Sequence, residues 1–259
     1  MKVYIHTDLE GVSGIDNLEM IQTQSDRFEE SRERLTEDVN AAVAGAFDGG
    51  AKHVTVLDSH GSGVENIIWD KIDKRAERDT KPTKRWWGIL DETYDATFFI
   101  GAHAMAGTIN AFLDHTQSSL QVYDWYYNGR KCGEMAQWAL VAGHFGVPLV
   151  MMSGDEAAVA EAYAFFDAIE TAPVKRGRGR NDAVLIDPDE AHRRIHDAAA
   201  RAVPRAKEAE PFRLTLPIEV ILDFTRSDYC DQHARGEGVE RIGARRVRKV
   251  APTALDILI

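Results

Sequence analysis

The chain has 259 residues, of which 44% are hydrophobic and 28% are charged, as in an ordinary globular protein. Its formal net charge of −11 argues against a general nucleic-acid-binding protein, because such proteins need basic surfaces. No apolar run approaches the roughly 18 residues that a membrane-spanning helix needs, and the first residues show no sign of a signal peptide. Cys132 and Cys230 are too few for a disulfide scaffold, so we expect a reducing cytoplasm.

The amino-terminal segment carries two carboxylates directly after an expected strand. Residues 3–5 are predicted as a short buried strand, and Gly11 permits a sharp turn after it. Alternate side chains of an extended segment point the same way, so Asp8 and Glu10 would face one spot. Two neighbouring anions repel unless a cation lies between them, and a divalent metal is the usual solution. Taken alone, the pair is also typical of a solvated acidic turn.

A β-α-β pattern places a histidine at the end of a second strand. Apolar residues recur at helical spacing over 26–48, and residues 53–57 form a strand that leads to His60. This order is typical of a parallel sheet, in which ligands bind beyond the carboxyl ends of the strands. Asp8, Glu10 and His60 would all lie at such ends.

A third strand ends in the same way. Residues 67–85 are predicted as a surface helix and loop, with the Trp86-Trp87 pair packing on the sheet. Residues 96–100 then form a strongly apolar strand that runs directly into His103. A single buried histidine is usually structural, but a third strand end with a metal-competent side chain strengthens the prediction of a site.

Two further candidates follow around a hairpin. His115 lies in a loop with no clear periodicity. Residues 120–127 alternate in polarity, and Asn128-Gly129 is a strong signal for a hairpin. Glu134 then opens a helix over 135–144, where the helix dipole alone would also favour a carboxylate.

The remaining chain continues as strands and helices without a linker or repeat. The segment 175–180 is basic and Gly-rich but lacks phosphate-loop spacing, so we expect a solvated loop or a subunit contact. The predicted fold is α/β, a mostly parallel sheet flanked by helices, with an appended carboxyl-terminal α+β portion. Residues 1–190 would form the metal-binding α/β hydrolytic core, and 191–259 the carboxyl-terminal portion of the same unit. Further strands are expected at 149–152, 171–174, 212–224 and 245–250, helices at 155–166 and 188–203, and a short apolar end at 255–259.

The polar residues at these positions form a candidate metal site. Carboxylates and imidazoles together suit zinc or a similar transition metal. Four or five such ligands exceed what one catalytic zinc needs, and would suit two metals about 3.5–4 Å apart with a bridging carboxylate such as Asp8. Such a pair would support metal-assisted hydrolysis, although no compact motif fixes it. The candidates are Asp8, Glu10, His60, His103, His115 and Glu134.

Several short blocks together resemble the D-aminopeptidase family. The resemblance covers at least residues 1–190 and, more loosely, the rest, and it depends on the order and intervals of the blocks. They are Asp8-Leu9-Glu10-Gly11, Asp58-Ser59-His60, Gly101-Ala102-His103-Ala104, Asp114-His115 and Gly133-Glu134.

The resemblance implies a zinc-dependent aminopeptidase with a binuclear site, hence two Zn²⁺ per subunit. It also implies a homodecamer whose active sites face an inner channel that admits short peptides. From the net charge and the lack of a long apolar run, we expect no nucleic-acid or membrane partner. His115 matches the family's proposed catalytic histidine, described there as a nucleophile. On physical grounds we expect a general acid/base or an oxyanion stabiliser. The implied metal ligands are Asp8, Glu10, His60, His103 and Glu134.

Two departures from the family affect these expectations. His6 stands where the family usually has Ser, and the alternation of strand side chains would aim it towards the site. There it would bind the metal, form a hydrogen bond to a metal ligand, or block the site. It is equally typical of a partly buried strand histidine. The tail, which ends at Ile259, looks shorter than the family's, and this bears on the oligomeric contacts. The Trp86-Trp87 pair and residues 123–127 would shape a different pocket, so D-amino acid specificity carries over less directly.

Three functions therefore stay open from the sequence. The first is a metal-dependent hydrolase that cuts an amino-terminal peptide bond or a related amide. The second is an amidohydrolase on the same scaffold that acts on a small non-peptide amide. The third is a non-catalytic peptide-binding protein with a structural metal, which an exposed ligand cluster at strand ends makes less favoured.

Overall fold

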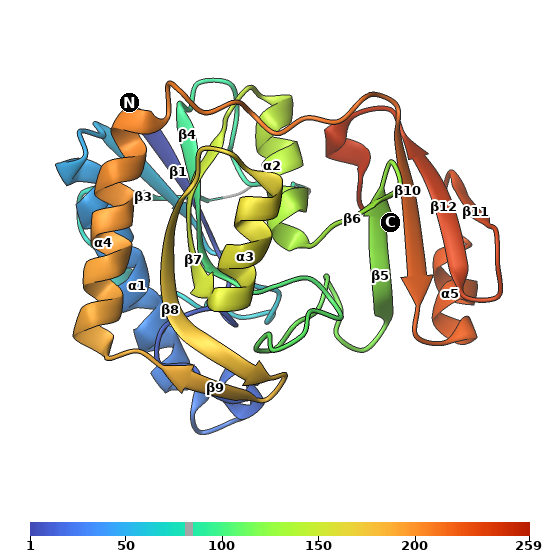
Figure 1. Cartoon of the computed structure of the whole chain (residues 1–259), viewed down its shortest axis with the longest axis horizontal. Coiled ribbons are helices and arrows are strands. Elements are labelled where there is room, and N and C mark those ends of the chain that lie inside the picture. The colour runs from blue at the N-terminus through green and yellow to red at the C-terminus, as the bar shows by residue number, and fades with distance from the viewer. Residues whose placement is uncertain (81–84) are drawn as a thin grey trace.

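The computed structural model describes residues 1–80 and 85–259, and its larger sheet confirms the predicted α/β fold (Figure 1). The strand order is β3-β2-β1-β4-β7-β8-β9, and every neighbouring pair is parallel except β8–β9. The strands are β1 Lys2–Thr7, β2 His53–Leu57, β3 Ala76–Arg78, β4 Ala96–Ala102, β7 Leu149–Asp155, β8 Glu170–Gly179 and β9 Asp182–Leu185.

Helices cover both faces of this sheet. α1 and α4 share one hydrophobic core with Val3 and Ile5, whereas α2 and α3 share another with Tyr4. This division follows from the two-residue alternation of strand side chains. In the described part of the chain, no helix is both long and apolar enough to cross a membrane. The helices are α1 Phe28–Asp48, α2 Glu134–His144, α3 Glu156–Phe165, α4 Pro188–Arg205 and α5 Ser227–His233.

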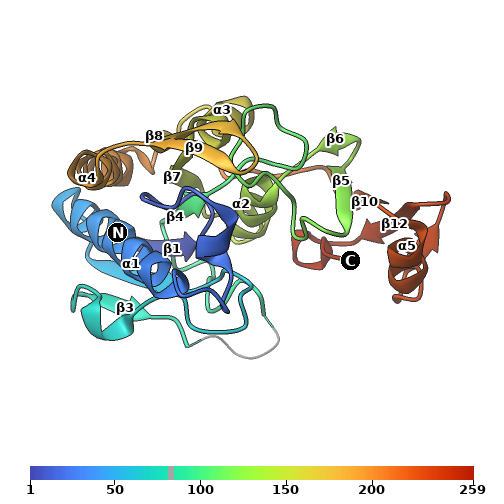
Figure 2. The same cartoon turned by 90° about the horizontal axis from the view of Figure 1, so that it is seen from below.

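A smaller antiparallel sheet stands beside the first one (Figures 1 and 2). Its order is β11-β12-β10-β5-β6. α2 packs between the two sheets, because Trp138 and Ala139 face the large sheet while Leu140 and Val141 face the small one. The strands are β5 Val122–Tyr127, β6 Arg130–Lys131, β10 Ile218–Phe224, β11 Val239–Arg241 and β12 Arg246–Ala251.

The small sheet draws strands from both sides of residue 190. β5 and β6 precede that residue, and α4, which begins at Pro188, packs on α1 and β8 of the large sheet. The division into 1–190 and 191–259 as parts of one unit stays a prediction.

Three sequence predictions differ from the structure. Residues 67–80 hold a short 3₁₀ turn, Trp69–Lys71, and β3 instead of a surface helix, while 81–84 of that predicted segment lie outside the described residues. The segment 175–180, predicted as a loop, is mostly strand, because β8 pairs with β9 as far as Gly179. The strand expected over 212–224 begins only at Ile218, directly after Pro217, which has no N–H to donate.

The order of the strands explains where a site can form. From β1 and β4, which are neighbours, the chain order runs outward in opposite directions. This is the switch point of an open α/β sheet, where ligands bind beyond the carboxyl ends of the strands. Asp8 follows β1 there, and His103 follows β4.

Candidate metal centre and active site

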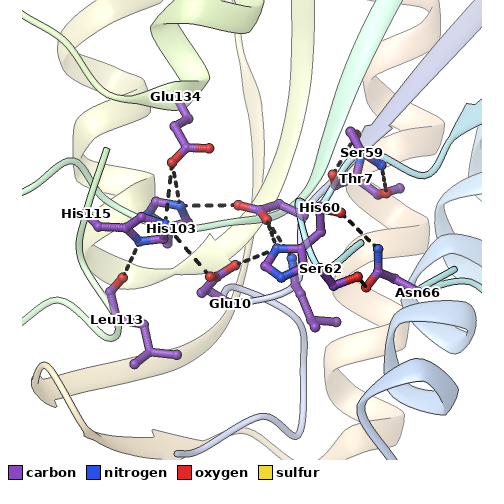
Figure 3. Close-up of polar contacts among 12 residues, drawn as sticks. Thr7, Glu10, Ser59, His60, Ser62, Asn66, His103, Leu113, His115 and Glu134 are labelled. Atoms are coloured by element: carbon purple, nitrogen blue, oxygen red, sulfur yellow. Dashed lines mark hydrogen bonds and ion pairs between the residues drawn. The ribbon is translucent and has the colours of Figure 1, made fainter. Parts of the chain in front are cut away.

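All six predicted candidates meet at this switch point. Figure 3 shows His60, His103, His115, Glu10 and Glu134 pointing toward one another. They come from the segments after β1, β2 and β4, from the loop before β5, and from the first residue of α2.

The first half of the cluster is built around His60. Its Nδ1 donates a hydrogen bond to Asp8 Oδ1 at 2.9 Å and lies 3.2 Å from Glu10 Oε2. Asp8 and Glu10 are almost completely buried. These three side chains therefore present two carboxylates and one imidazole to the same small volume.

The second half is built around His103. Its Nε2 lies 3.3 Å from Asp8 Oδ2 and 3.4 Å from Glu134 Oε1. The His115 ring stacks on the His103 ring with centroids 4.0 Å apart, and its Nε2 lies 3.6 Å from Glu134 Oε1. Asp8 thus faces His60 with one carboxylate oxygen and His103 with the other, as a bridging carboxylate would.

Main-chain carbonyls fix the orientation of two imidazoles. His103 Nδ1 donates to the carbonyl of Ala104 at 3.0 Å, and His115 Nδ1 donates to the carbonyl of Leu113 at 2.8 Å. In both rings the Nε2 atom is then the one turned to the carboxylates. Such outer hydrogen bonds are typical of metal-binding histidines because they select the tautomer.

Several atoms of the cluster lack the hydrogen bonds that their burial demands. Asp8 Oδ2, Glu10 Oε2 and His103 Nε2 are buried and have no hydrogen-bond partner among the described residues. An unsatisfied buried polar atom costs about 1–3 kcal/mol, so three of them at one spot need an explanation. Carboxylate oxygens and imidazole nitrogens are zinc ligands, and a bound cation would satisfy all three. The residues present therefore fit a metal.

Candidate ligand atoms also group by distance. Among the described residues, Asp8, Glu10 and His103 form one group that could hold an ion, and His103, His115 and Glu134 form another, with ligand atoms within 4.8 Å of one another in each group. His60 belongs to neither group by this measure, although its Nδ1 contacts Asp8 and Glu10. Two adjacent groups that share a residue are compatible with a binuclear site.

The pKa values reflect the same proximity. Burial opposes the charged forms of Asp8, His60 and His103, but the neighbouring opposite charges outweigh it. The pKa of Asp8 therefore lies below its ordinary value. Burial raises the pKa of Glu134, but His103 outweighs this effect and lowers the pKa to about 2. The pKa values of His60 and His103 lie well above 6.5, despite burial, because of Glu10, Glu134 and Asp8.

Two glycines allow the turn after β1 to lie on the end of β4. A Cβ at Gly11 would lie 1.9 Å from the carbonyl oxygen of Ala102, and a Cβ at Gly101 would lie 2.2 Å from that of Asp8. The N–H of Gly11 donates to the carbonyl of Gly101 at 2.8 Å. This close approach brings Asp8 against the segment that carries His103.

The loop that carries His115 has unusual backbone angles. Asn110, Leu113 and Gln117 have positive φ, which costs non-glycine residues about 1–3 kcal/mol each and occurs most often at functional sites. Gln117 N–H also donates to Glu134 Oε1 at 2.6 Å. The surrounding structure thus holds His115 and Glu134 in one fixed arrangement.

A pocket of about 270 Å³ opens directly beside the cluster. Its lining includes Asp8, His60, His115 and Glu134 on the polar side, together with the larger side chains of Trp86 and Leu258. The cluster is therefore accessible to a small substrate.

His6 also lines this pocket, as its strand position predicted. Its ring stacks on Trp138 with centroids 4.1 Å apart, and its Nδ1 shares a hydrogen bond with Ser59 Oγ at 3.0 Å. Ser59 directly precedes His60, so His6 supports the segment that carries a candidate ligand. That His6 orients a metal ligand stays a prediction.

Sequence reasoning missed residues that act on the site from a distance. Lys175 is fully buried and contacts the turn that carries Glu10, and Arg180 donates to the carbonyl of Asp114, beside His115. The sequence predicts both residues in a solvated loop or a subunit contact. Leu258, near the end of the chain, reaches the pocket although nothing in its sequence context indicates this.

Comparisons with known proteins agree with the geometry. The model of the D-aminopeptidase family matches residues 1–258. The chain is 32% identical over 232 residues to a D-aminopeptidase of Bacillus subtilis (strain 168), covering 88% of this chain and 82% of that relative. A solved structure, described as the Zn-dependent D-aminopeptidase DppA from Bacillus subtilis, a self-compartmentalizing protease, superposes with a TM-score of 0.93 at 28% identity. That match covers 99% of this chain and 94% of the other. The chain therefore belongs to the D-aminopeptidase family of peptidases.

Proposed function

We propose that this chain is a zinc-dependent aminopeptidase that removes the amino-terminal residue from short peptides or amino-acid amides, with a preference for D-amino acids. The observation that carries the proposal is the Asp8 carboxylate, whose two oxygens face His60 on one side and His103 on the other. The family relationship and the zinc dependence stated for the solved relative support it.

The metal ligands would be Asp8 as the bridge, Glu10 and His60 in one half, and His103 and Glu134 in the other. Bound zinc ions would supply Lewis acidity, which lowers the pKa of water and polarises the scissile carbonyl. The protein's own contribution is to hold these ligands in a mostly buried cluster, where water screens their charges little.

His115 would move the proton. In the neutral ring Nδ1 carries the hydrogen that is donated to Leu113, so Nε2 is free to accept one. A residue at the pocket wall with such an atom can take the proton of the attacking water and return it to the leaving amine. This assigns His115 a general acid/base role and needs no covalent intermediate.

Zinc removal and replacement test the proposal. Chelator-treated protein should lose turnover of short peptides and amides with D-alanine at the amino terminus, and added zinc should restore it. His60→Ala and Glu134→Ala should lose both zinc and turnover with the fold retained. His53→Ala, at the opposite end of β2, is the matched control.

Two results would contradict the proposal. Full turnover in a preparation without metal would remove zinc from the reaction. Turnover of simple amides with none of D-alanyl peptides or amino-acid amides would instead favour the amidohydrolase alternative.

We also propose that the chain assembles into a homo-oligomer, a homodecamer by family resemblance, in the cytoplasm. The solved relative is described as self-compartmentalizing. Large apolar side chains at Ile109, Leu120 and Tyr123 are mostly exposed in one segment, which suits a contact between copies. The free cysteines Cys132 and Cys230 suit a reducing compartment. Light scattering on the purified protein tests the assembly, and a monomer would contradict it.

A further inference from the structure

Lys175 is a fully buried lysine that lies behind the metal centre. It belongs to β8, three places along the sheet from β1. Its Nζ donates to the main-chain carbonyl of Glu10 at 2.8 Å and to that of Ile15 at 2.7 Å, residues 165 and 160 positions earlier in the chain. The ammonium also lies over the Phe112 ring, 4.7 Å from its centroid.

Burying a lysine in this way costs free energy of folding, which a residue that serves only to fill space would not need to spend. A lysine loses its hydration when it is buried, and both of its hydrogen-bond acceptors here are neutral carbonyls rather than carboxylates. Well-packed apolar residues commonly replace buried charges with no loss of stability. A role beyond packing therefore explains Lys175 better.

The role cannot be contact with the substrate. Lys175 is not part of the pocket lining, and its Nζ is directed to the backbone of residues 10–15. These two bonds join the two ends of the turn that follows the acidic pair. Asp38, from α1, holds the middle of the same turn through the N–H and hydroxyl of Ser13, at 2.8 and 2.5 Å.

We propose that Lys175 is a positioning residue that fixes the main chain at Glu10 and so aims the Glu10 carboxylate at the metal centre. Glu10 Oε2 is one of the buried atoms without a hydrogen bond, and His60 Nδ1 lies 3.2 Å from it, so the place of the main chain at Glu10 decides where the carboxylate points. The inference rests on the proposed function, because Glu10 acts there as a metal ligand.

The test compares zinc affinities of the full chain. Lys175→Met keeps an unbranched apolar side chain of nearly the same length but removes the donor. Outer residues that orient metal ligands typically change affinity about 10–100-fold, and we expect a loss of this size in a chelator competition with Zn²⁺. Lys74→Met is the matched control, since Lys74 is exposed and its Nζ donates to the main-chain carbonyl of Asp70.

A double-mutant cycle separates positioning from a general effect on the fold. If Lys175 acts through Glu10, the Lys175→Met substitution should change zinc affinity less than about 3-fold in a Glu10→Gln background. The reason is that the Glu10 carboxylate, which Lys175 positions, is already absent there. Circular dichroism and thermal unfolding of all variants report the fold. If Lys175→Met is not folded, Lys175→Gln takes its place with the same measurements.

Every outcome of these measurements either supports or overturns the inference. Unchanged zinc affinity in Lys175→Met, an equal loss in both backgrounds, or loss of the fold in both Lys175 variants overturns the inference. The last result would make Lys175 a requirement of the fold rather than of Glu10. A wild-type chain that binds no zinc would instead overturn the proposed function, so the two failures are distinguishable.

Discussion

Zinc binding to the metal-free protein should release protons at pH 7. In the absence of metal, burial acts against protonation of His60, but Glu10 and Asp8 outweigh it, and its pKa lies well above 6.5. His103 behaves in the same way through Glu134 and Asp8. We therefore expect both rings to carry a second proton at pH 7 in the metal-free protein.

The size of the release follows from the individual groups. Zinc binds imidazole in its neutral form, so each of these two histidines must lose one proton. Despite burial, the pKa values of Asp8, Glu10 and Glu134 lie below their ordinary values, so these carboxylates are already ionised and release none. We expect about two protons per subunit at pH 7.

The same shifts set the pH dependence of stability. A raised pKa in the folded state stabilises below the ordinary histidine pKa of about 6.5 and loses this contribution as the pH rises through the folded value. The metal-free protein should therefore lose stability on going from pH 7 to more alkaline solution. Zinc affinity should rise over the same range, because fewer protons compete.

Titration calorimetry in buffers of different ionisation enthalpy measures the release directly. The apparent binding enthalpy should change with the ionisation enthalpy of the buffer in proportion to the release of about two protons. His53→Ala should match the unmodified chain. Binding enthalpies that are the same in every buffer would contradict this prediction, since they would mean that the histidines are already neutral.

Three substitutions probe other parts of the site. His115→Asn should lower kcat by about 10²–10⁴ with zinc content unchanged, measured by atomic absorption; wild-type kcat would exclude proton transfer by His115. Gly11→Ala should cost about 1–3 kcal/mol in urea unfolding and lower zinc affinity, because its Cβ would meet the Ala102 carbonyl; full stability would show that the turn relaxes freely. Trp86→Ala should raise kcat/KM for bulky amino-terminal residues about 10-fold relative to alanine, and an unchanged profile would remove Trp86 from the substrate pocket.

The strand ends were predictable because their signal is local. Apolar runs followed directly by Asp8, His60 or His103 predict polar side chains at one edge of a parallel sheet, and the structure confirms that placement. His115 and Glu134 had no such signal. His115 lies in an aperiodic loop, and Glu134 is a common type of residue for a first helical turn, so residue type alone made them candidates and the family resemblance gave them roles in the site.

The rest of the site depends on contacts between distant segments. The 175–180 segment looks like a loop because Gly and Arg alternate there, yet pairing between β8 and β9 makes most of it a strand. Lys175 reaches Glu10 across 165 residues, and Leu258 reaches the pocket from near the end of the chain. Local composition carries no information about such contacts, since they are set by the order of strands in the sheet.

The place of His115 favours a proton-transfer role over that of a sixth ligand. Its Nε2 lies 3.6 Å from Glu134 and 3.9 Å from Glu10, farther than His103 Nε2 lies from its two carboxylates. His103 is almost completely buried, whereas His115 is partly exposed and lines the pocket. A ligand must stay bound through the reaction, while an acid/base must meet substrate and water. Because the His115 side chain is supported by a loop rather than by a strand end, its exchange for Asn can remove the proton acceptor and leave the ligands on the strands in place.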